Sequence, residues 1–411
     1  MEVVYEFFNN DDLIYFLVIP FFSGFVGLTT NYIGIKMMFS PLEFVGIRPI
    51  FGWQGIVPAR AGKFARLQME QVEKIIDFQE LINRINPSEV ANIIRPGMKE
   101  LTEEIIDEVA SESFPLAWEN TPNFIKNRFY KRLEKDLPTL FDNIYNDVRD
   151  KFDSMFDAKA MVIDRLTSDK GILVDMTHQT VHKELGFLVK SGLYFGFLFG
   201  VVQMIFWYLF PDAWYVLPVG GFVVGYLTNW IAVKLMFHPL NPKKLGPLTF
   251  HGLFLKRKDE VARDYAKSMT TSVLNSQNIA EYILKSSAGD RIYELVNRHV
   301  KKTIDNSMGY GKPLVLATIG TQRYIDMKNS AVDRFSNNAV SLPKSITNGL
   351  VYTEQALDLE NEIELQMKKF TPLEFDGFVR PVFEEDEWIL YAVGGGLGFL
   401  AGWIQFVTMF S

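Results

Sequence analysis

The 411-residue chain contains no cysteine and only five histidines. Without cysteine it can form no disulfide, no cysteine–zinc site and no thiol nucleophile. His178 and His182 have helical spacing, but Gln179 stands where a zinc protease has glutamate. The sequence also lacks a phosphate-binding G-x-x-x-x-G-K-[ST] loop and a G-x-S-x-G nucleophile elbow. We therefore expect no catalytic residue, no metal site and no cofactor, and a protein that is not an enzyme.

Basic residues are in the minority, with 42 lysines and arginines against 49 acids and a net charge of −7. A dedicated nucleic-acid-binding protein needs a basic surface, so we expect no nucleic-acid partner. Aromatic residues make up 14% of the chain, which excludes a mainly disordered protein.

Charged residues are nearly absent from four stretches, residues 13–39, 187–210, 213–237 and 388–410, each of which contains at most one. Each stretch has the roughly 20 residues needed to cross a hydrocarbon core of about 30 Å. Soluble core helices of this length rarely carry so little charge, so the pattern predicts four transmembrane helices. The mean hydropathy of +0.05 is then the average of four apolar spans and a charged remainder.

The lysines and arginines predict how these spans are oriented. Basic residues follow the first and third spans, at Arg48, Arg60, Lys63, Arg66, Lys243, Lys244, Lys256, Arg257 and Lys258. The turn between the second and third spans has none, and neither has the short N-terminal segment 1–12, which therefore lacks the basic start of a signal peptide. The positive-inside rule places the long segments 40–186 and 238–387 in the cytoplasm and both termini outside.

The chain matches itself at a fixed offset. Residues 20–42 and 218–240 are identical at 11 of 23 positions, and both contain G-x-x-T-N-x-I-x-x-K. The second and fourth spans share G-x-x-x-G-x-x-x-G-x-x-Q at an offset of 202. Such self-similarity indicates an internal repeat. We predict a tandem repeat in which each copy is a span, a helical segment and a returning span.

The segments between the spans carry apolar residues every three or four positions, a pattern typical of long helices packed in bundles or coiled coils. Asn86-Pro87-Ser88 interrupts the pattern, with Ser88 as the predicted N-cap, and Thr121-Pro122 starts a further helix. The predicted fold is an all-α integral membrane protein with four transmembrane helices and two long helical cytoplasmic segments.

The glycine motif of the returning spans clears one helix face, so that a neighbouring helix can approach closely. The predicted helix-packing residues are Gly192, Gly196, Gly200, Gln203, Gly394, Gly398, Gly402 and Gln405. Spans two and four would pack together, or each would pack against span one or three. The alternative is a glycine-lined pore wall. Each glutamine is expected to form a hydrogen bond across a helix interface.

Two polar pairs, Thr30-Asn31 and Thr228-Asn229, lie inside apolar spans. An unpaired amide in hydrocarbon costs about 2–7 kcal/mol, so these groups require polar partners. They either hold helices together or form a polar binding site near the axis that relates the two copies.

Four cations complete the candidate binding residues. Lys36 and Lys234 lie near the cytoplasmic ends of their spans, where they would extend to the interface or pair with a lipid phosphate or an acid. Arg60 and Arg257 belong to a basic collar that would attract anionic phospholipid headgroups.

The two G-x-x-T-N stretches, with GLFLKRKDEVAR at 252–263, HKELGFLVKSGLYFGFLFGVVQ at 182–203 and RPVFEEDEWILYAVGGGLGFLAGWIQ at 380–405, resemble the domain of unknown function 445 family, bacterial inner-membrane proteins of the YheB type. Family members commonly have I-P-K-R-R after the first span. Each copy here keeps only part of it, as Val57-Pro58-Ala59-Arg60 and Leu255-Lys256-Arg257-Lys258. The resemblance implies a multi-pass inner-membrane protein and brings no activity and no catalytic residues.

Two functional hypotheses follow. The first is a non-enzymatic scaffold of the cell envelope, whose helical cytoplasmic segments oligomerise or bind a partner, because far more of the chain is helical segment than span. The second is a transporter, channel or lipid-moving protein that uses the duplicated Thr-Asn pairs. The expected partners are the lipid bilayer, anionic headgroups and further copies of the chain.

Overall fold

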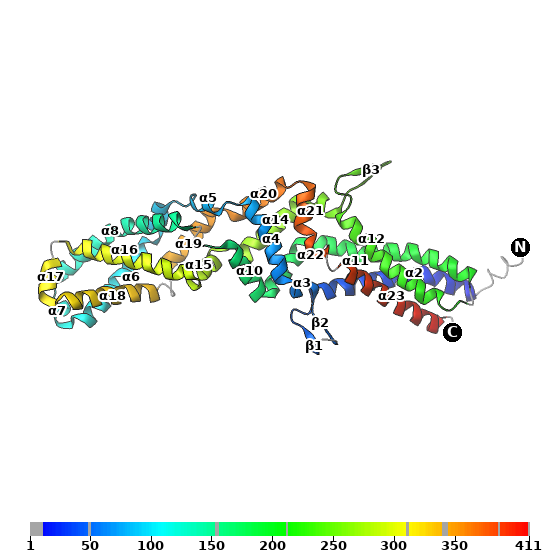
Figure 1. Cartoon of the computed structure of the whole chain (residues 1–411), viewed down its shortest axis with the longest axis horizontal. Helices are drawn as coiled ribbons and strands as arrows, with labels where there is room; N and C mark the ends of the chain where they lie inside the picture. The colour runs from blue at the N-terminus through cyan, green and yellow to red at the C-terminus, as the bar shows by residue number, and fades with distance from the viewer. Residues whose placement is uncertain are drawn as a thin grey trace, which may run out of the picture. The chain divides into compact units, whose positions relative to one another are not determined.

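The computed structural model describes residues 11–47, 51–152, 156–210, 213–309, 312–338, 344–384 and 387–409. The chain folds into two compact units (Figure 1). Unit 1 contains residues 1–75, 162–273 and 360–411, and unit 2 contains residues 76–161 and 274–359. The predicted helical fold is confirmed, and four of its helices are long and apolar enough to cross a membrane. Of the expected N-terminal segment 1–12, only the last two residues are described, and they begin helix α2.

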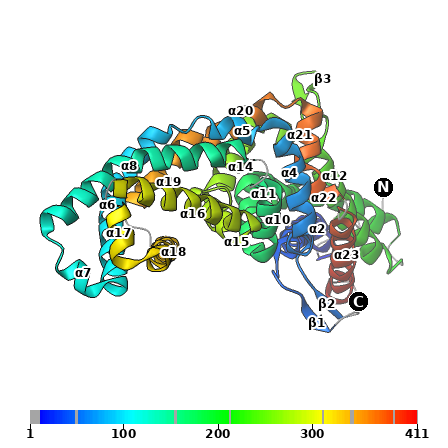
Figure 2. The ribbon, with the colours of Figure 1, turned by 60° about the vertical axis from the view of Figure 1, so that its left-hand side comes forward.

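Four long helices of unit 1 are apolar and long enough to cross a membrane: α2 (Asp11–Phe39), α11 (Lys170–Leu209), α12 (Val216–Phe237) and α23 (Glu387–Met409). They lie side by side in Figures 1 and 2. Large apolar side chains point outward from them, including Phe21 and Tyr194, which are 68% and 69% exposed. A belt of exposed apolar side chains of this size is suited to contact with lipid chains.

Helix α11 is longer than a membrane span. Its 40 residues correspond to about 60 Å, twice the thickness of a hydrocarbon core of about 30 Å. Its first half carries charged residues such as Asp175, Lys183 and Glu184, and its second half carries the apolar span expected at 187–210. One continuous helix therefore joins a span to the charged part of unit 1.

Backbone contacts at glycines hold these helices together in pairs. A Cβ atom on Gly27 of α2 would overlap the carbonyl oxygen of Gly192 on α11, and the reverse substitution would overlap Gly27. Gly225 of α12 and Gly394 of α23 block each other in the same way. The remaining motif glycines lie against backbone atoms of the same two partner helices, Gly196 and Gly200 against α2 and Gly398 and Gly402 against α12. The glycine faces of α11 and α23 thus pack against the first and third spans.

The rest of unit 1 is made of short helices around a buried core. They are α3 (Ile56–Ala59), α4 (Ala61–Ile75), α13 (Leu253–Lys256), α14 (Lys258–Ser272), α20 (Leu359–Lys369), α21 (Pro372–Val379) and α22 (Pro381–Glu384). Helix α10 (Ala158–Ser168) crosses the division between the units. Met69, Met269 and Phe375 are fully buried here. A capping box of Thr371 and Glu374 satisfies free backbone N–H groups where α21 begins.

Two short β-hairpins, which the sequence analysis did not predict, follow the first and third spans. Strands β1 (Val45–Ile47) and β2 (Phe51–Trp53) pair antiparallel, as do β3 (Lys243–Leu245) and β4 (Leu248–Phe250). Gly246 has a φ of +63°, a conformation that glycine adopts without strain, and it lies in the turn between β3 and β4. Three-residue strands are too short to show the alternation by which strands are recognised in a sequence.

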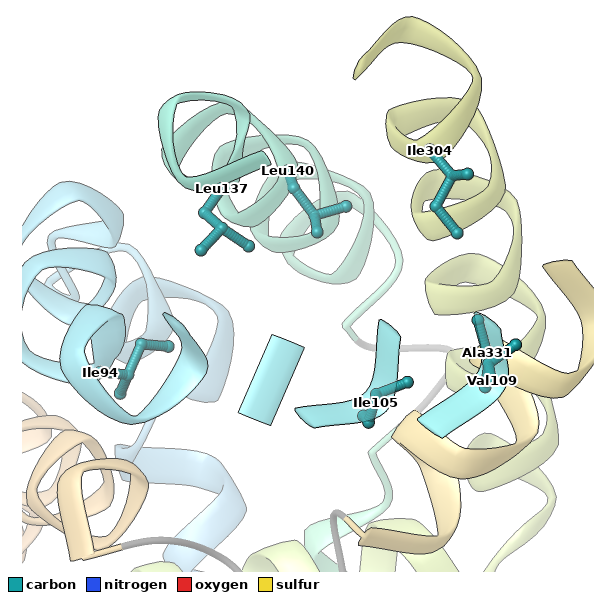
Figure 3. Close-up of a cluster of buried hydrophobic side chains, with 7 residues drawn as sticks. All are labelled: Ile94, Ile105, Val109, Leu137, Leu140, Ile304 and Ala331. Carbon is teal, nitrogen blue, oxygen red and sulfur yellow. The ribbon is translucent and has the colours of Figure 1, made fainter. Parts of the chain in front are cut away.

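Unit 2 is a helical bundle. Its helices are α5 (Phe78–Ile82), α6 (Pro87–Ser113), α7 (Pro115–Glu119), α8 (Asn123–Asp150), α15 (Ser276–Lys285), α16 (Ser287–Met308), α17 (Lys312–Ile319), α18 (Thr321–Asn338) and α19 (Lys344–Leu357). Figure 3 shows its core, in which side chains from α6, α8, α16 and α18 meet. The two segments expected between the spans therefore share one core, because α6 and α8 come from the first and α16 and α18 from the second.

The start of α6 differs from the prediction by two residues. The N-cap is Asn86, whose side chain accepts a hydrogen bond of 3.1 Å from the Ser88 backbone N–H, and not Ser88 itself. Pro87 occupies the first helical position, where its missing N–H has no consequence. A proline therefore identifies the residue before it as the better N-cap.

We expect Gly192→Ala to destabilise unit 1 by about 1–3 kcal/mol, because the new methyl group must separate α11 from α2. Gly186→Ala is the matched control on the same helix, since its Cβ would meet nothing within 4 Å. It should change the unfolding free energy by no more than about 1 kcal/mol, and towards greater stability. Equilibrium unfolding in mixed micelles, followed by circular dichroism, measures both. Equal effects would show that the glycine contact is not needed.

Candidate functional site

The two asparagines of the Thr-Asn pairs are fully buried between helices. Asn31 Nδ2 donates a hydrogen bond of 2.6 Å to the Leu188 carbonyl of α11, and Asn229 Nδ2 donates one of 2.8 Å to the Leu390 carbonyl of α23. Both residues are 0% exposed. Asn31 therefore binds the helix that Gly27 contacts, and Asn229 binds the helix that Gly225 contacts. The two amides are directed to different helices, α11 and α23.

The threonines bond within their own helices. Thr30 Oγ1 donates to the Gly27 carbonyl and Thr228 Oγ1 to the Gly225 carbonyl, each at 3.2 Å. Both side chains are buried. Their hydroxyl groups are satisfied by the carbonyls three residues earlier, which is a common way for a helix to accommodate threonine in an apolar environment.

The carbonyl oxygens of the two asparagine side chains, Oδ1 of Asn31 and of Asn229, have no hydrogen-bond partner in the described chain. A buried acceptor left unpaired costs about 1–3 kcal/mol. Because neither side chain is exposed, a solute could reach these oxygens only if the paired helices separated. In this arrangement the two asparagines form contacts between helices, and the threonines bond within their own helices.

The glutamines of the two glycine motifs meet at one place. Gln203 accepts a hydrogen bond of 3.1 Å from Ser23 Oγ of α2 and donates one of 3.2 Å to the Leu217 carbonyl of α12. Gln203 and Gln405 line one cavity of about 10 Å³ together with Ser23. This is close to the space that a single water needs. Gln203 therefore joins three spans, and the cavity is too small for a pathway.

The lysines and arginines of the predicted collar differ in their surroundings. Lys36 and Lys234 are exposed in the last turns of α2 and α12, where a cation complements the helix dipole. Arg60 is exposed where α3 ends. Arg257, its counterpart after the third span, is only 17% exposed and lies between α13 and α14. The structure thus leaves three of these cations accessible and encloses the fourth.

Arg257 is held by two carboxylates. Its Nη1 contacts Glu184 Oε1 of α11, and its Nε and Nη2 donate to Glu260 Oε2 at 2.9 and 2.8 Å. The Glu184 side chain is 1% exposed. Lys183 Nζ binds the same Glu260 oxygen at 2.7 Å. Hydrogen bonds from Lys183 and then Arg257 hold the pKa of Glu260 at about 2, so it stays ionised at neutral pH. The cluster fastens α14 to α11, and its charges are already paired.

Glu184 is the residue of this cluster that the sequence analysis missed. It lies on the buried face of α11 with Val181, Leu185 and Leu188, all buried. An acidic residue in the middle of an apolar helical stripe indicates a buried ion pair, so a signal was present. Its partner could not be found, because Arg257 is 73 residues away.

His178 lies beside the ring of Phe39, with ring centroids 5.9 Å apart, and His182 Nδ1 donates a hydrogen bond of 2.7 Å to the Gln179 carbonyl of its own helix. Among the residues the structure describes, no three histidine, aspartate or glutamate side chains gather as metal ligands. The described residues of unit 1 thus form interhelical hydrogen bonds and a buried ion-pair cluster.

Comparison with known proteins agrees with these features. Residues 219–341 match the family described as "Protein of unknown function (DUF445)". The resemblance to this family is confirmed. The matched stretch of this chain begins within α12 and includes the Thr228-Asn229 pair, Arg257 and Glu260, and helices α15 to α18 of unit 2.

Several similar proteins are membrane proteins of the UPF0754 group. UPF0754 membrane proteins of Staphylococcus epidermidis, Halalkalibacterium halodurans and Bacillus pumilus are 25%, 30% and 34% identical over 112, 90 and 89 residues. These matches cover 26%, 21% and 21% of this chain and 30%, 24% and 23% of the relatives, so under a third of each relative is matched. No solved structure matches the chain. With the four apolar helices, the comparisons identify a multi-pass membrane protein.

We expect Arg257→Gln to destabilise unit 1 by about 3–5 kcal/mol, because it leaves the Glu184 carboxylate buried without its cation. The double variant Glu184→Gln/Arg257→Gln should recover most of this loss, since no charge is then left unpaired. Lys183→Gln, which removes an exposed partner of Glu260, should cost less than about 1 kcal/mol. The same micellar unfolding assay measures all three. Additive losses in the double variant would contradict the ion-pair role.

Proposed function

We propose that the protein is a non-enzymatic, membrane-anchored scaffold in which the four spans serve as an anchor and the helical bundle of unit 2 carries the function. The burial of Asn31 and Asn229 supports this most directly, because both amides are engaged with the backbone of a neighbouring span and are 0% exposed. The paired glycines leave no space between the same helices. Polar side chains that bind the backbone of a neighbouring span are not available to bind a solute during transport.

We further propose that the chain is a tandem repeat of span, helical segment and span. Aligned positions make aligned contacts, which supports this organisation: Asn31 binds Leu188 as Asn229 binds Leu390. The repeat boundaries we propose are spans at 13–39, 187–210, 213–237 and 388–410, with the segments 40–186 and 238–387 between them. Both segments contribute helices to unit 2, so the two copies would fold as one protein and not as independent modules.

In the proposed orientation, both long segments lie in the cytoplasm and both termini face outward across the bacterial inner membrane. The positive-inside rule supports it, because the exposed cations Lys36 and Lys234 lie in the last turns of the spans that lead into these segments, and Arg60 lies at the end of α3, after the first span. These three side chains would contact anionic phospholipid headgroups. Assembly into homo-oligomers belongs to the same proposal, because a scaffold gains reach by joining copies.

The absence of cysteine from the chain allows a direct test of orientation. Leu116→Cys places a thiol on α7 of unit 2, where the native side chain is 77% exposed, and Ala213→Cys places one between α11 and α12. A membrane-impermeant maleimide should label Ala213→Cys in intact spheroplasts, and Leu116→Cys only after permeabilisation. Unsubstituted protein is the control for background labelling. The reverse pattern would show that the orientation is wrong.

One observation favours the alternative, a transporter or lipid-moving protein. The unpaired Oδ1 atoms of Asn31 and Asn229 are polar groups that a second arrangement of the helices could expose to a solute. This alternative requires α2 to separate from α11, and α12 from α23, during each cycle. The scaffold requires no such motion, and it explains the burial of the pairs without a second state.

Complementation of a deletion strain separates the two functions. The double variant Asn31→Leu/Asn229→Leu should insert into the membrane and restore the wild-type phenotype to the deletion strain. The proposed anchor requires packed spans and does not require a polar binding site. Replacement of residues 76–161 and 274–359 by flexible linkers removes unit 2 and should abolish complementation. Maleimide labelling at Ala213→Cys, introduced into each variant, checks membrane insertion. A normally inserted double variant without activity would favour transport, and activity without unit 2 would exclude the scaffold.

A further inference from the structure

Unit 2 contains a large apolar cavity that the proposed scaffold function does not use. Its volume is about 590 Å³, within the range of about 300–1,000 Å³ typical of small-molecule sites. Residues of α6, α7, α8, α16, α17 and α18 line it. Three of them, Val109, Ile304 and Ala331, belong to the core drawn in Figure 3, so the cavity opens from the centre of the bundle.

The walls of this cavity are chiefly apolar. Phe114, Phe129, Val315, Ile319 and Met327 contribute aromatic and aliphatic side chains from both halves of the chain. Protein cores normally pack without spaces of this size, since packing density approaches that of organic crystals. An apolar cavity of several hundred Å³ is therefore a ligand site more often than a packing fault.

The charged residues of the lining are all cations. Lys126, Arg128 and Arg132 lie on the first turns of α8, and no aspartate or glutamate is among the described lining residues. Arg128 and Arg132 are exposed and one helical turn apart, so their guanidinium groups can converge on one anion. The cavity is thus apolar inside and positively charged at its edge.

Two contacts fix this edge. Lys126 Nζ lies 4.6 Å from the centre of the Trp118 ring, and Trp118 Nε1 donates a hydrogen bond of 2.9 Å to Asp107 Oδ1. Gly309 lies beside Arg132, because a Cβ atom there would come within 2.9 Å of Arg132 Nη1. The indole is therefore held in place as a wall, and a glycine leaves room for the guanidinium.

We propose that this cavity binds a long-chain fatty acid, with the acyl chain among the apolar side chains and the carboxylate at Arg128 and Arg132. A small inorganic anion would leave the apolar walls unused, and a neutral apolar ligand would leave the three cations unused. An amphipathic anion matches both. The site lies wholly within unit 2, and the proposal adds a ligand to the scaffold without depending on the scaffold role.

Photo-crosslinking tests this on the full chain in nanodiscs of zwitterionic lipid. The probe is palmitate with a diazirine at the end of its chain, and labelled peptides are mapped by mass spectrometry. Labels are expected in residues 106–132 and 304–331. Unlabelled palmitate should suppress them at a concentration at least about tenfold lower than methyl palmitate, which lacks the charge and so loses an interaction of about 1.4 kcal/mol or more.

Charge reversal on α8 supplies the matched variants. Arg128→Glu/Arg132→Glu should reduce labelling of these peptides at least fivefold. Lys131→Glu/Lys135→Glu makes the same charge change at exposed positions of the same helix that do not line the cavity, and it should leave labelling unchanged. Circular dichroism on both variants checks the fold. Because all four residues are exposed, loss of structure in only the first pair would itself contradict the proposal.

A cavity-filling variant provides an independent measurement. Ala110→Phe adds a ring at a buried lining position and should reduce labelling without changing the exposed cations. The proposal is wrong if labels are confined to the membrane spans, if methyl palmitate competes as well as palmitate, or if both charge-reversal pairs behave alike. If an amphipathic peptide suppressed the labelling and unlabelled palmitate did not, the cavity would be a binding site for a protein segment instead.

Discussion

The packing of the four apolar helices of unit 1 depends on direct contact between helix backbones, at Gly27 with Gly192 and at Gly225 with Gly394. Inside a bilayer, lipid chains are as apolar as leucine, so burial of apolar surface does not draw helices together and close packing must. The asparagines rely on the same contact. The Asn31 amide reaches the α11 backbone because Gly192 has no side chain, and a Cβ atom there would lie 2.8 Å from its Nδ2. The glycine motif and the Thr-Asn motif are therefore two halves of one interface.

The sequence was sufficient for much of this interface. The apolar stretches, the glycine faces and the polar pairs could all be found from periodicity and composition, and four apolar helices are present. The pairing of the spans could not be found, because periodicity identifies the face of a helix and not its partner. Gly27 and Gly225 held the missing information, since each lies one turn before its asparagine and leaves space on the face that the asparagine presents. That spacing identifies the contact face of the first and third spans, and the structure identifies the partner of each face.

Unit 2 shows where sequence reasoning ends. The spacing of apolar residues predicted helices, and Thr121-Pro122 does precede α8. The joining of two segments into one core depends on contacts between α6 and α18, or α8 and α16, that are far apart in the chain. The cavity has a local cause that could be seen only afterwards. Pro115 and Pro122 interrupt the chain between α6 and α8 and leave the short helix α7, whose Trp118 lines the cavity.

The Arg257 cluster connects helix α11, which contains the second span, to helix α14 of unit 1. A buried carboxylate such as Glu184 is tolerated only with a paired cation, and Arg257 is placed by the junction of α13 and α14. Because α11 is one continuous helix of 40 residues, its apolar half cannot shift or rotate without moving Glu184. Separation of Glu184 from Arg257 would leave the buried Glu184 carboxylate without its cation, so the cluster resists such movement. The position of α14 is thereby fixed relative to the helix that contains the second span.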